Sequence, residues 1–166
     1  MIKIAFSGTH GTGKTTSAFE HVAELKMKYP DRTVGILSEN VINCPLPINR
    51  EATVQSQLWI FADHLRQEIE LSTKYDILVC DRSVYDAIAY MWRIDETTAT
   101  GMLRTVTAYA RTYTTIYFKR AATNEYKNDD GLRDTDEEFR LYIDKQLETI
   151  YNHLKSFHPS LNIIEL

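Results

Sequence analysis

The chain has 166 residues, 43% of them hydrophobic, which is enough for one folded domain with a buried core of its own. Its formal net charge of −4 disfavours a protein that grips long nucleic acid mainly by neutralising phosphates. No apolar run approaches the ~18 residues of a membrane span, the N-terminus opens directly into a strand, and the two cysteines suggest neither a disulfide framework nor a metal cluster, so we expect a cytoplasmic protein.

The first predicted strand, 2–7, leads directly into a glycine-rich loop. This loop fits the phosphate-binding pattern G-x-x-x-x-G-K-[ST], with the residues Gly8-Thr9-His10-Gly11-Thr12-Gly13-Lys14-Thr15, followed by Thr16. Its glycines let successive backbone N–H groups turn inward around a phosphate, Lys14 reaches the outer phosphates, and the Thr15 hydroxyl can ligand Mg²⁺. We therefore expect residues 9–16 to bind the phosphates of a nucleotide, with His10 contributing only its backbone.

Helical and strand patterns alternate after this loop. A helix over 14–28 ends before Pro30, and 33–38 is the second strand. The next helix, 51–71, carries apolar residues at steps of three or four, and this spacing predicts that they face the sheet. They are Val54, Leu58, Phe61, Leu65 and Ile69.

The second half of the chain continues the alternation. A third strand over 76–80 precedes a helix that begins at a capping box of Ser83 and Asp86. A helix over 95–111 and a strand over 113–118 follow. The last helix runs from a capping box of Thr135 and Glu138 to about Leu154, and a fifth strand covers 161–164.

This alternation predicts an α/β fold with a mostly parallel sheet, and the chain shows no repeat or interdomain linker. We expect a single domain over 1–166. Two connections, 39–50 and 121–134, are longer than most loops of compact domains. Both are candidates to close over ligands, and the second is the candidate lid before the last helix.

Charged residues follow the second and third strands. In open parallel sheets ligands bind beyond the carboxyl ends of the strands, where Glu39 and the pair Asp81-Arg82 are expected to lie. Four apolar residues followed by Asp81 are typical of the carboxylate that holds Mg²⁺ in phosphate-loop enzymes. Glu39 is placed where a base for a hydroxyl nucleophile is useful.

Phosphoryl transfer requires neutralisation of charge around the transferring group, commonly by an arginine in a lid. Arg133 is the first candidate, because it lies just ahead of the last helix. Arg140 lies two turns into that helix and is the weaker candidate. Lys119 and Arg120 leave the fourth strand and are better explained as a solvated pair.

The connection that ends at Arg50, together with the helix after it, is expected to form one wall of the acceptor site. Gln55 and Trp59 share a helix face at i, i+4. The amide of Gln55 could therefore hydrogen-bond to an edge of the acceptor, and the ring of Trp59 could stack on it. Packing in the core is the simpler explanation of Trp59, and Gln57 is no stronger a candidate for a contact with the ligand.

These residues resemble those of the small P-loop kinases related to nucleoside and nucleotide kinases, most closely the nicotinamide riboside kinase-like AAA-type ATPases. The likeness rests on the phosphate loop, on Glu39, on Asp81-Arg82-Ser83, and on the segment Asp129-Asp130-Gly131-Leu132-Arg133. The phosphate loop is highly specific, whereas the other motifs gain weight from their order and spacing.

The resemblance implies a three-layer P-loop NTPase fold, with a five-stranded parallel sheet in the order 2-3-1-4-5 and helices on both faces. It also implies ATP with Mg²⁺ and transfer of the γ-phosphate to a nucleoside-like acceptor. Lys14 and Arg133 would stabilise the transition state, and Thr15 and Asp81 would hold the metal. Arg82 would clamp acceptor or phosphate, and Glu39 would act as general base.

The acceptor is left open by the sequence. Glu39 favours a hydroxyl, whereas Arg50 with Arg82 could clamp a phosphate and define a nucleoside monophosphate kinase. A kinase acting on DNA, at a 5′ hydroxyl or on a hydroxymethylated base such as 5-hydroxymethyluracil, is a third alternative, which the net charge does not favour.

Other classes of protein also use a phosphate loop. A switch GTPase would need an N-K-x-D stretch, and a remodelling ATPase would need a second helical domain. A non-catalytic nucleotide sensor would bind ATP without turnover.

Overall fold

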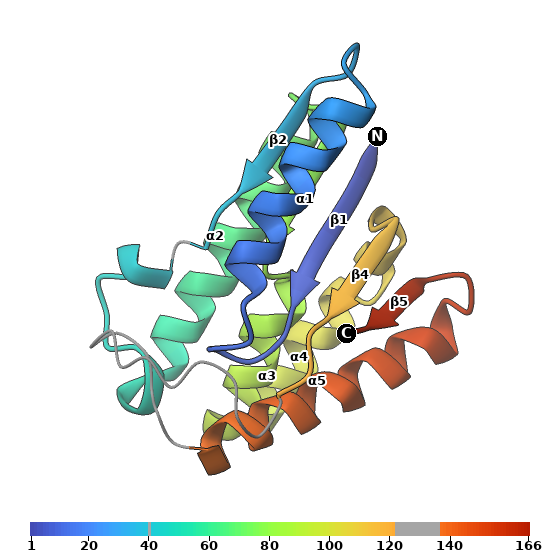
Figure 1. The fold of residues 1–166 in the computed structure, drawn as a ribbon. Helices are drawn as coiled ribbons and strands as arrows, with labels where there is room; N and C mark the ends of the chain where they lie inside the picture. The colour runs from blue at the N-terminus through green and yellow to red at the C-terminus, as the bar shows by residue number, and fades with distance from the viewer. Residues whose placement is uncertain (40, 122–136) are drawn as a thin grey trace.

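The computed structural model describes residues 1–39, 41–121 and 137–166. Five parallel strands form one sheet in the order β2-β3-β1-β4-β5 (Figure 1). Their bounds are β1 Ile2–Ser7, β2 Val34–Leu37, β3 Ile77–Asp81, β4 Thr115–Phe118 and β5 Asn162–Glu165. The parallel α/β class expected from the sequence and the strand order implied by the resemblance are both confirmed.

In the described ranges, five α-helices cover the two faces of this sheet. They are α1 Lys14–Lys28, α2 Val54–Ser72, α3 Val84–Ile94, α4 Glu96–Val106 and α5 Glu137–Phe157. Short 3₁₀ helices, η1 Val41–Asn43, η2 Asn49–Glu51 and η3 Ala108–Thr112, lie in the connections. Within these ranges no helix is long and apolar enough to cross a membrane.

The two faces of the sheet belong to two separate apolar cores. Ile4 and Phe6 of β1 pack with α1, whereas the intervening Ala5 belongs to the larger core with α3, α4 and α5. This division follows from the period of two in a strand, which sends successive side chains to opposite faces. The result is the three-layer arrangement, with α1 on one face in Figure 1 and the other helices on the opposite face.

The predicted helix 95–111 is interrupted in the structure. α4 ends at Val106, and η3 continues over Ala108–Thr112. Near the break, the hydroxyl of Thr107 donates to the carbonyl of Leu103 at 2.7 Å, and that of Thr105 to the carbonyl of Gly101 at 2.9 Å. Such bonds to a carbonyl one turn back destabilise and bend helices.

The apolar stripe predicted for α2 is partly wrong. Leu58 and Ile69 are 40% and 52% exposed, although Val54, Phe61 and Leu65 do pack against the core. The buried side of α2 is mostly polar instead. It is formed by Ser56, Gln57, Ile60, His64 and Glu68.

A buried lysine explains the part of this polar face that His64 and Glu68 form. The ammonium of Lys3, on β1, donates to Glu68 at 3.0 Å and to the hydroxyls of Tyr109 and Thr112. The other carboxylate oxygen of Glu68 lies 3.0 Å from Nε2 of His64. A buried charge needs a paired and hydrogen-bonded partner, so α2 turns its polar side toward β1.

Candidate functional site

The phosphate loop leaves β1 and enters α1 as the sequence predicts. Gly11 and Gly13 have φ of 72° and 73°, a left-handed conformation that favours glycine. At Gly8 a Cβ atom would lie 2.3 Å from the backbone oxygen of Lys119, so only glycine fits beside β4. The loop therefore has the backbone geometry that an anion-binding concavity requires.

Asp86, in the first turn of α3, fixes the start of this loop. Its carboxylate accepts from the Ser7 hydroxyl at 2.8 Å and from the Gly8 backbone N–H at 3.1 Å. It also closes the capping box with Ser83, as predicted. The first role could not be predicted from the sequence, because a capping box is visible locally and a bond to a residue 78 positions away is not.

Lys14 is buried within its own loop. Its ammonium donates to the carbonyl of Thr9 at 2.6 Å, and 5% of the residue is exposed. Burial, together with the nearby charge of Arg82, lowers the pKa of Lys14 to about 7. A bound polyphosphate would place negative charge beside Lys14 and would thereby favour its charged form.

Thr15 and Asp81 meet where β3 ends beside the first turn of α1. The Thr15 hydroxyl donates to one carboxylate oxygen of Asp81 at 2.7 Å, and the other oxygen, Oδ1, is buried without a hydrogen-bond partner among the described residues. Burial raises the pKa of Asp81, and the bond from Thr15 offsets this only in part.

These two residues fit the magnesium role assigned to them. Mg²⁺ is usually held by one or two carboxylates together with substrate phosphates and water, rather than by a cage of protein ligands. A hydroxyl and a buried carboxylate with an unused oxygen would provide such a partial site. No group of three or more His, Cys, Asp or Glu side chains arranged for a metal occurs in the described part of the chain.

Arg82 and Glu39 form an ion pair at the same edge of the sheet. Nε of Arg82 donates to Glu39 at 2.6 Å, and Nη1 lies 3.4 Å from both the Gly8 carbonyl and Asp86. Arg82 has a φ of 91°, which is strained for a residue with a side chain. The strained backbone is therefore that of the residue whose guanidinium contacts both the phosphate loop and Glu39.

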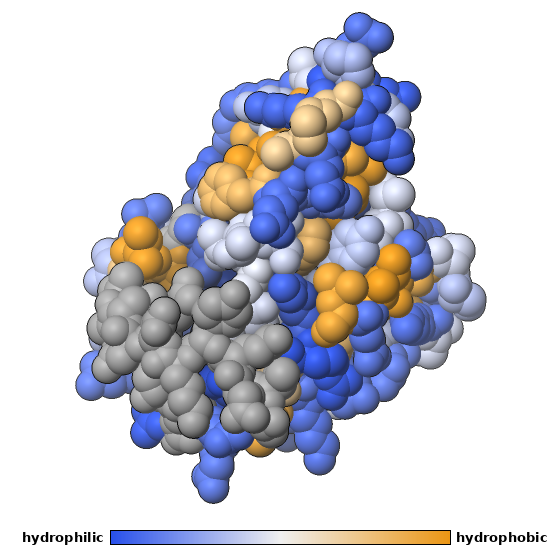
Figure 2. All heavy atoms as spheres, in the orientation of Figure 1, coloured by the Kyte–Doolittle hydropathy of each residue, from blue (hydrophilic) through white to orange (hydrophobic). Residues whose placement is uncertain are grey.

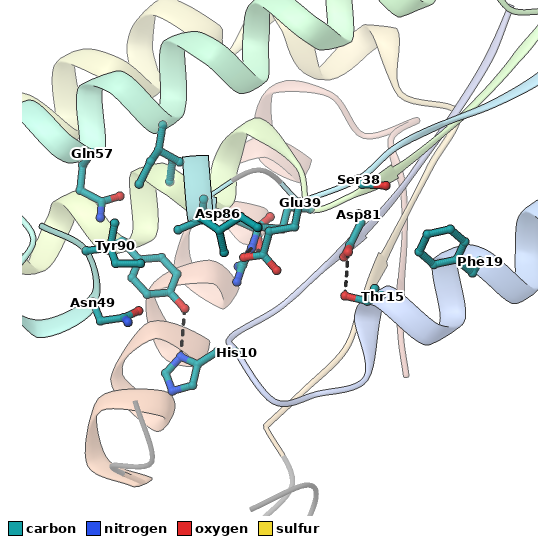
Figure 3. Close-up of a pocket in the computed structure, with 16 residues that line it drawn as sticks. His10, Thr15, Phe19, Ser38, Glu39, Asn49, Gln57, Asp81, Asp86 and Tyr90 are labelled. Atoms are coloured by element: carbon teal, nitrogen blue, oxygen red, sulfur yellow. Dashed lines mark hydrogen bonds and ion pairs between the residues drawn. The ribbon is translucent and has the colours of Figure 1, made fainter. Parts of the chain in front are cut away.

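A cavity of about 320 Å³ opens beside the phosphate loop. Figure 3 shows Thr15 and Asp81 at one end, Gln57, Asn49 and Tyr90 at the other, and Glu39 between them. Apolar side chains complete its walls, namely Phe19, Val41, Ile42, Ile48, Ile60 and Ala87. The connection between β2 and α2 thus borders a ligand-sized cavity, as its length suggested.

The predicted acceptor residues on α2 are only partly placed near this cavity. Gln55 is exposed and Trp59 half-buried, and neither lines the cavity, whereas Gln57 does. Arg50 is exposed beside the lining residue Asn49. Gln57 belongs to the buried side of α2, whereas Gln55 lies on its exposed side.

Three basic candidates from the sequence have different outcomes. Arg133 lies outside the described residues. Arg120 pairs with Asp144 at 2.9 Å and with Glu148 at 3.2 Å, so it ties β4 to α5. Lys119 donates to the Ser17 hydroxyl at 2.8 Å and therefore lies against the first turns of α1.

Solved structures of other proteins share this fold. A deoxyadenosine kinase from M. mycoides with bound dATP superposes with a TM-score of 0.66 at 17% identity, over 100% of this chain and 90% of its own. A thymidylate kinase from Ehrlichia chaffeensis gives 0.66 at 18% identity, over 99% and 86%. Among curated proteins, none matches this sequence.

The fold and the phosphate loop together define a small P-loop protein, and its fold is shared by the solved nucleoside and nucleotide kinases. The family model described as "AAA domain" matches residues 3–159, which is nearly the whole chain. The chain therefore belongs to the AAA domain family.

Proposed function

We propose that this protein is a kinase that transfers the γ-phosphate of ATP to a hydroxyl group of a nucleoside-like acceptor. The observation that carries the proposal is the continuity of the phosphate loop with a cavity of about 320 Å³, since Thr15, Glu39 and Arg82 line both this cavity and the space over the loop. Phosphoryl transfer needs two bound reactants in line and fixed charges around the transferred group, and such a junction can supply both.

The charge of the cavity supports a hydroxyl acceptor over a phosphate. Its lining includes three carboxylates, Glu39, Asp81 and Asp86, and one arginine, Arg82, which already contacts two of these carboxylates. An acceptor phosphate would add negative charge to this set, and the described residues of the lining include no second arginine. A neutral nucleoside avoids that repulsion, and the apolar walls can pack against its base and sugar.

In the proposed step, the acceptor oxygen attacks the γ-phosphorus while Glu39 takes the hydroxyl proton, and the bond to the β-phosphate oxygen breaks to release ADP. Arg82 holds the Glu39 carboxylate in place through the 2.6 Å bond. Lys14 stabilises the negative charge on the outer phosphates. A bound Mg²⁺, held by Thr15 and Asp81, would neutralise phosphate charge.

Radiolabelled ATP offered with separate acceptors tests the proposal. The panel consists of free nucleosides, nucleoside monophosphates, nicotinamide riboside, oligonucleotides and hydroxymethyluracil DNA. We expect label in a nucleoside-type compound. Transfer to monophosphates or to DNA alone would replace the proposed acceptor, and nucleotide binding without transfer to any acceptor would indicate a sensor.

The Glu39→Gln variant separates the acceptor classes by a second route. With a hydroxyl acceptor we expect kcat to fall at least ~100-fold with little change in KM, because the proton has no base. The glutamine oxygen can still accept from Arg82, so the geometry is preserved. Steady-state kinetics on the best acceptor measures this, with the exposed Glu51→Gln as matched control. A loss below tenfold would exclude Glu39 as the base.

Binding of ATP at pH 8 is expected to take up protons. Lys14, with a pKa of about 7 in the free protein, is mostly neutral at this pH, and the triphosphate favours its charged form. Because the complex binds more protons than the free protein, affinity should fall as pH rises from 7 to 10. Calorimetry in buffers of different ionisation enthalpy measures the uptake, and an equal uptake by Lys14→Met would contradict this origin.

A further inference from the structure

The buried carboxylate of Glu68 makes further hydrogen bonds besides its pair with Lys3. Hydrophilic residues predominate on the described part of the face in Figure 2, where water solvates them, whereas the side chains of Lys3 and Glu68 are 1% and 0% exposed. Removing two charges from water costs free energy that their attraction often does not repay. A role beyond stability would explain the pair, and its hydrogen bonds lead to the candidate site.

Tyr113, which follows η3, links Glu68 to α3. Its hydroxyl donates to Oε1 of Glu68 at 2.5 Å and accepts from the backbone N–H of Val84 at 3.2 Å. Because this hydroxyl has one proton and a carboxylate only accepts, the directions of both bonds are fixed. Burial, together with the charge of Glu68, raises the pKa of Tyr113 well above its usual range, so the proton is retained.

The packing of its ring gives the Tyr113 hydroxyl a defined position. The residue is 5% exposed, and its ring contacts the rings of Tyr85 and Tyr109, with centroid distances of 6.1 Å and 6.0 Å. The ammonium of Lys3 lies 4.9 Å from the centroid of the Tyr113 ring. A ring enclosed in this way has little room to move, so its hydroxyl can hold a backbone group in place.

The backbone group that it holds lies two positions after Arg82. Val84 is the first residue of α3, and the first N–H groups of a helix have no partner within it. The N–H of Ser83 donates to Asp86 in the same turn, at 2.8 Å. The N–H of Val84 depends instead on Tyr113, a side chain 29 positions further along the chain.

We propose that Tyr113 is a positioning residue that holds the backbone after Arg82 and thereby the guanidinium that binds Glu39. The φ of 91° at Arg82 is strained, and strain persists only where the surrounding structure holds it. The bond from Val84 to Tyr113 fixes the chain directly after this strained residue, whose Nε donates to Glu39 at 2.6 Å. The inference rests on the proposed function, in which Glu39 takes the proton of the acceptor.

Tyr113→Phe tests this role, because it removes the hydroxyl and keeps the ring. Tyr85→Phe is the matched control, since it removes another fully buried hydroxyl of the same core, one that donates to the carbonyl of Val106 at 3.0 Å. Steady-state kinetics on the acceptor labelled in the radiolabelled-ATP panel give kcat and the KM for ATP. Urea unfolding gives the stability of each variant.

We expect Tyr113→Phe to lower kcat at least ~10-fold and to change the KM for ATP by less than about twofold, because Glu39 is displaced and the phosphate loop is not. Tyr85→Phe should keep the kcat of the wild type, even where both variants lose stability. Equal kcat values for the two variants would overturn the proposal. A Tyr113→Phe protein that does not fold would also overturn it, by showing that the hydroxyl supports the fold as a whole.

Nuclear magnetic resonance of the ligand-free protein tests the position of Arg82 without any activity. Its Nε–H makes a short charge-assisted hydrogen bond to Glu39, which shifts the proton resonance downfield, and Arg82→Met identifies the signal by losing it. The signal should move upfield in Tyr113→Phe and stay in place in Tyr85→Phe. An unmoved signal in Tyr113→Phe would overturn the inference. Wild-type protein that phosphorylates no acceptor would instead overturn the proposed function, and the Arg82 signal would still decide the positioning role.

Discussion

Lys14→Met is expected to lower phosphoryl transfer at least ~100-fold, because in the proposed ATP site it removes an ammonium that stabilises the outer phosphates. The folded protein should lose little stability, since burial already disfavours the charged lysine and methionine is of similar length. Initial rates on the acceptor found in the panel, together with thermal melts of the ligand-free variant, measure both effects.

The exposed Lys26→Met on the same helix is the matched control, and its rate should equal that of the wild type. Turnover of Lys14→Met within tenfold of the wild type would exclude Lys14 from the reaction. A loss of activity accompanied by unfolding would instead show that Lys14 is structural, contrary to the expectation from its burial.

Glu68→Gln is expected to have the largest effect on stability. It leaves the ammonium of Lys3 buried without its carboxylate, and breaking a buried pair in this way costs about 3–5 kcal/mol. Urea unfolding followed by circular dichroism measures the loss. Glu70→Gln, two residues along α2 and exposed, removes only surface pairs with Arg66 and Lys74 and should cost far less.

The same carboxylate predicts the response to acid. Burial alone would raise the pKa of Glu68, but the bond from His64 and the charges of His64 and Lys3 outweigh it and lower the pKa below 4.5. The stabilisation is therefore fully present above pH 4.5 and is lost as the pH falls through the lowered pKa. Equal urea midpoints for Glu68→Gln and Glu70→Gln would show that the buried pair is not a source of stability.

Local sequence patterns predicted the candidate site residues that lie at the carboxyl ends of the strands. The phosphate loop, Glu39 and Asp81 follow strands directly, and parallel strands bring their carboxyl ends to one edge. Arg82 also lies there, although its strained backbone and its bond to Glu39 were not visible in the pattern. The second role of Asp86 and the contact between the rings of Tyr90 and Phe139 depend on segments far apart in the chain.

The face that α2 presents shows the limit of periodicity. An apolar stripe at helical spacing predicted a buried Leu58 and Ile69, yet both are exposed. Periodicity weighs each residue by its own hydropathy and has no knowledge of a buried lysine on another element. The side of α2 that carries Glu68, the partner of Lys3, also carries Gln57, which lines the cavity, whereas Gln55 lies on the exposed side.

The sequence by itself determined the alternation of strands and helices, the phosphate loop and the charged residues at the strand ends, because these depend on spacing over a few residues. The tertiary structure alone decided which side chains meet across the fold: Lys3 with Glu68, Asp86 with the start of the loop, and Arg140 with His10. Pairings of this kind are fixed by the cost of burying a charge or a polar group without a partner, and that cost is known only when the whole chain is packed.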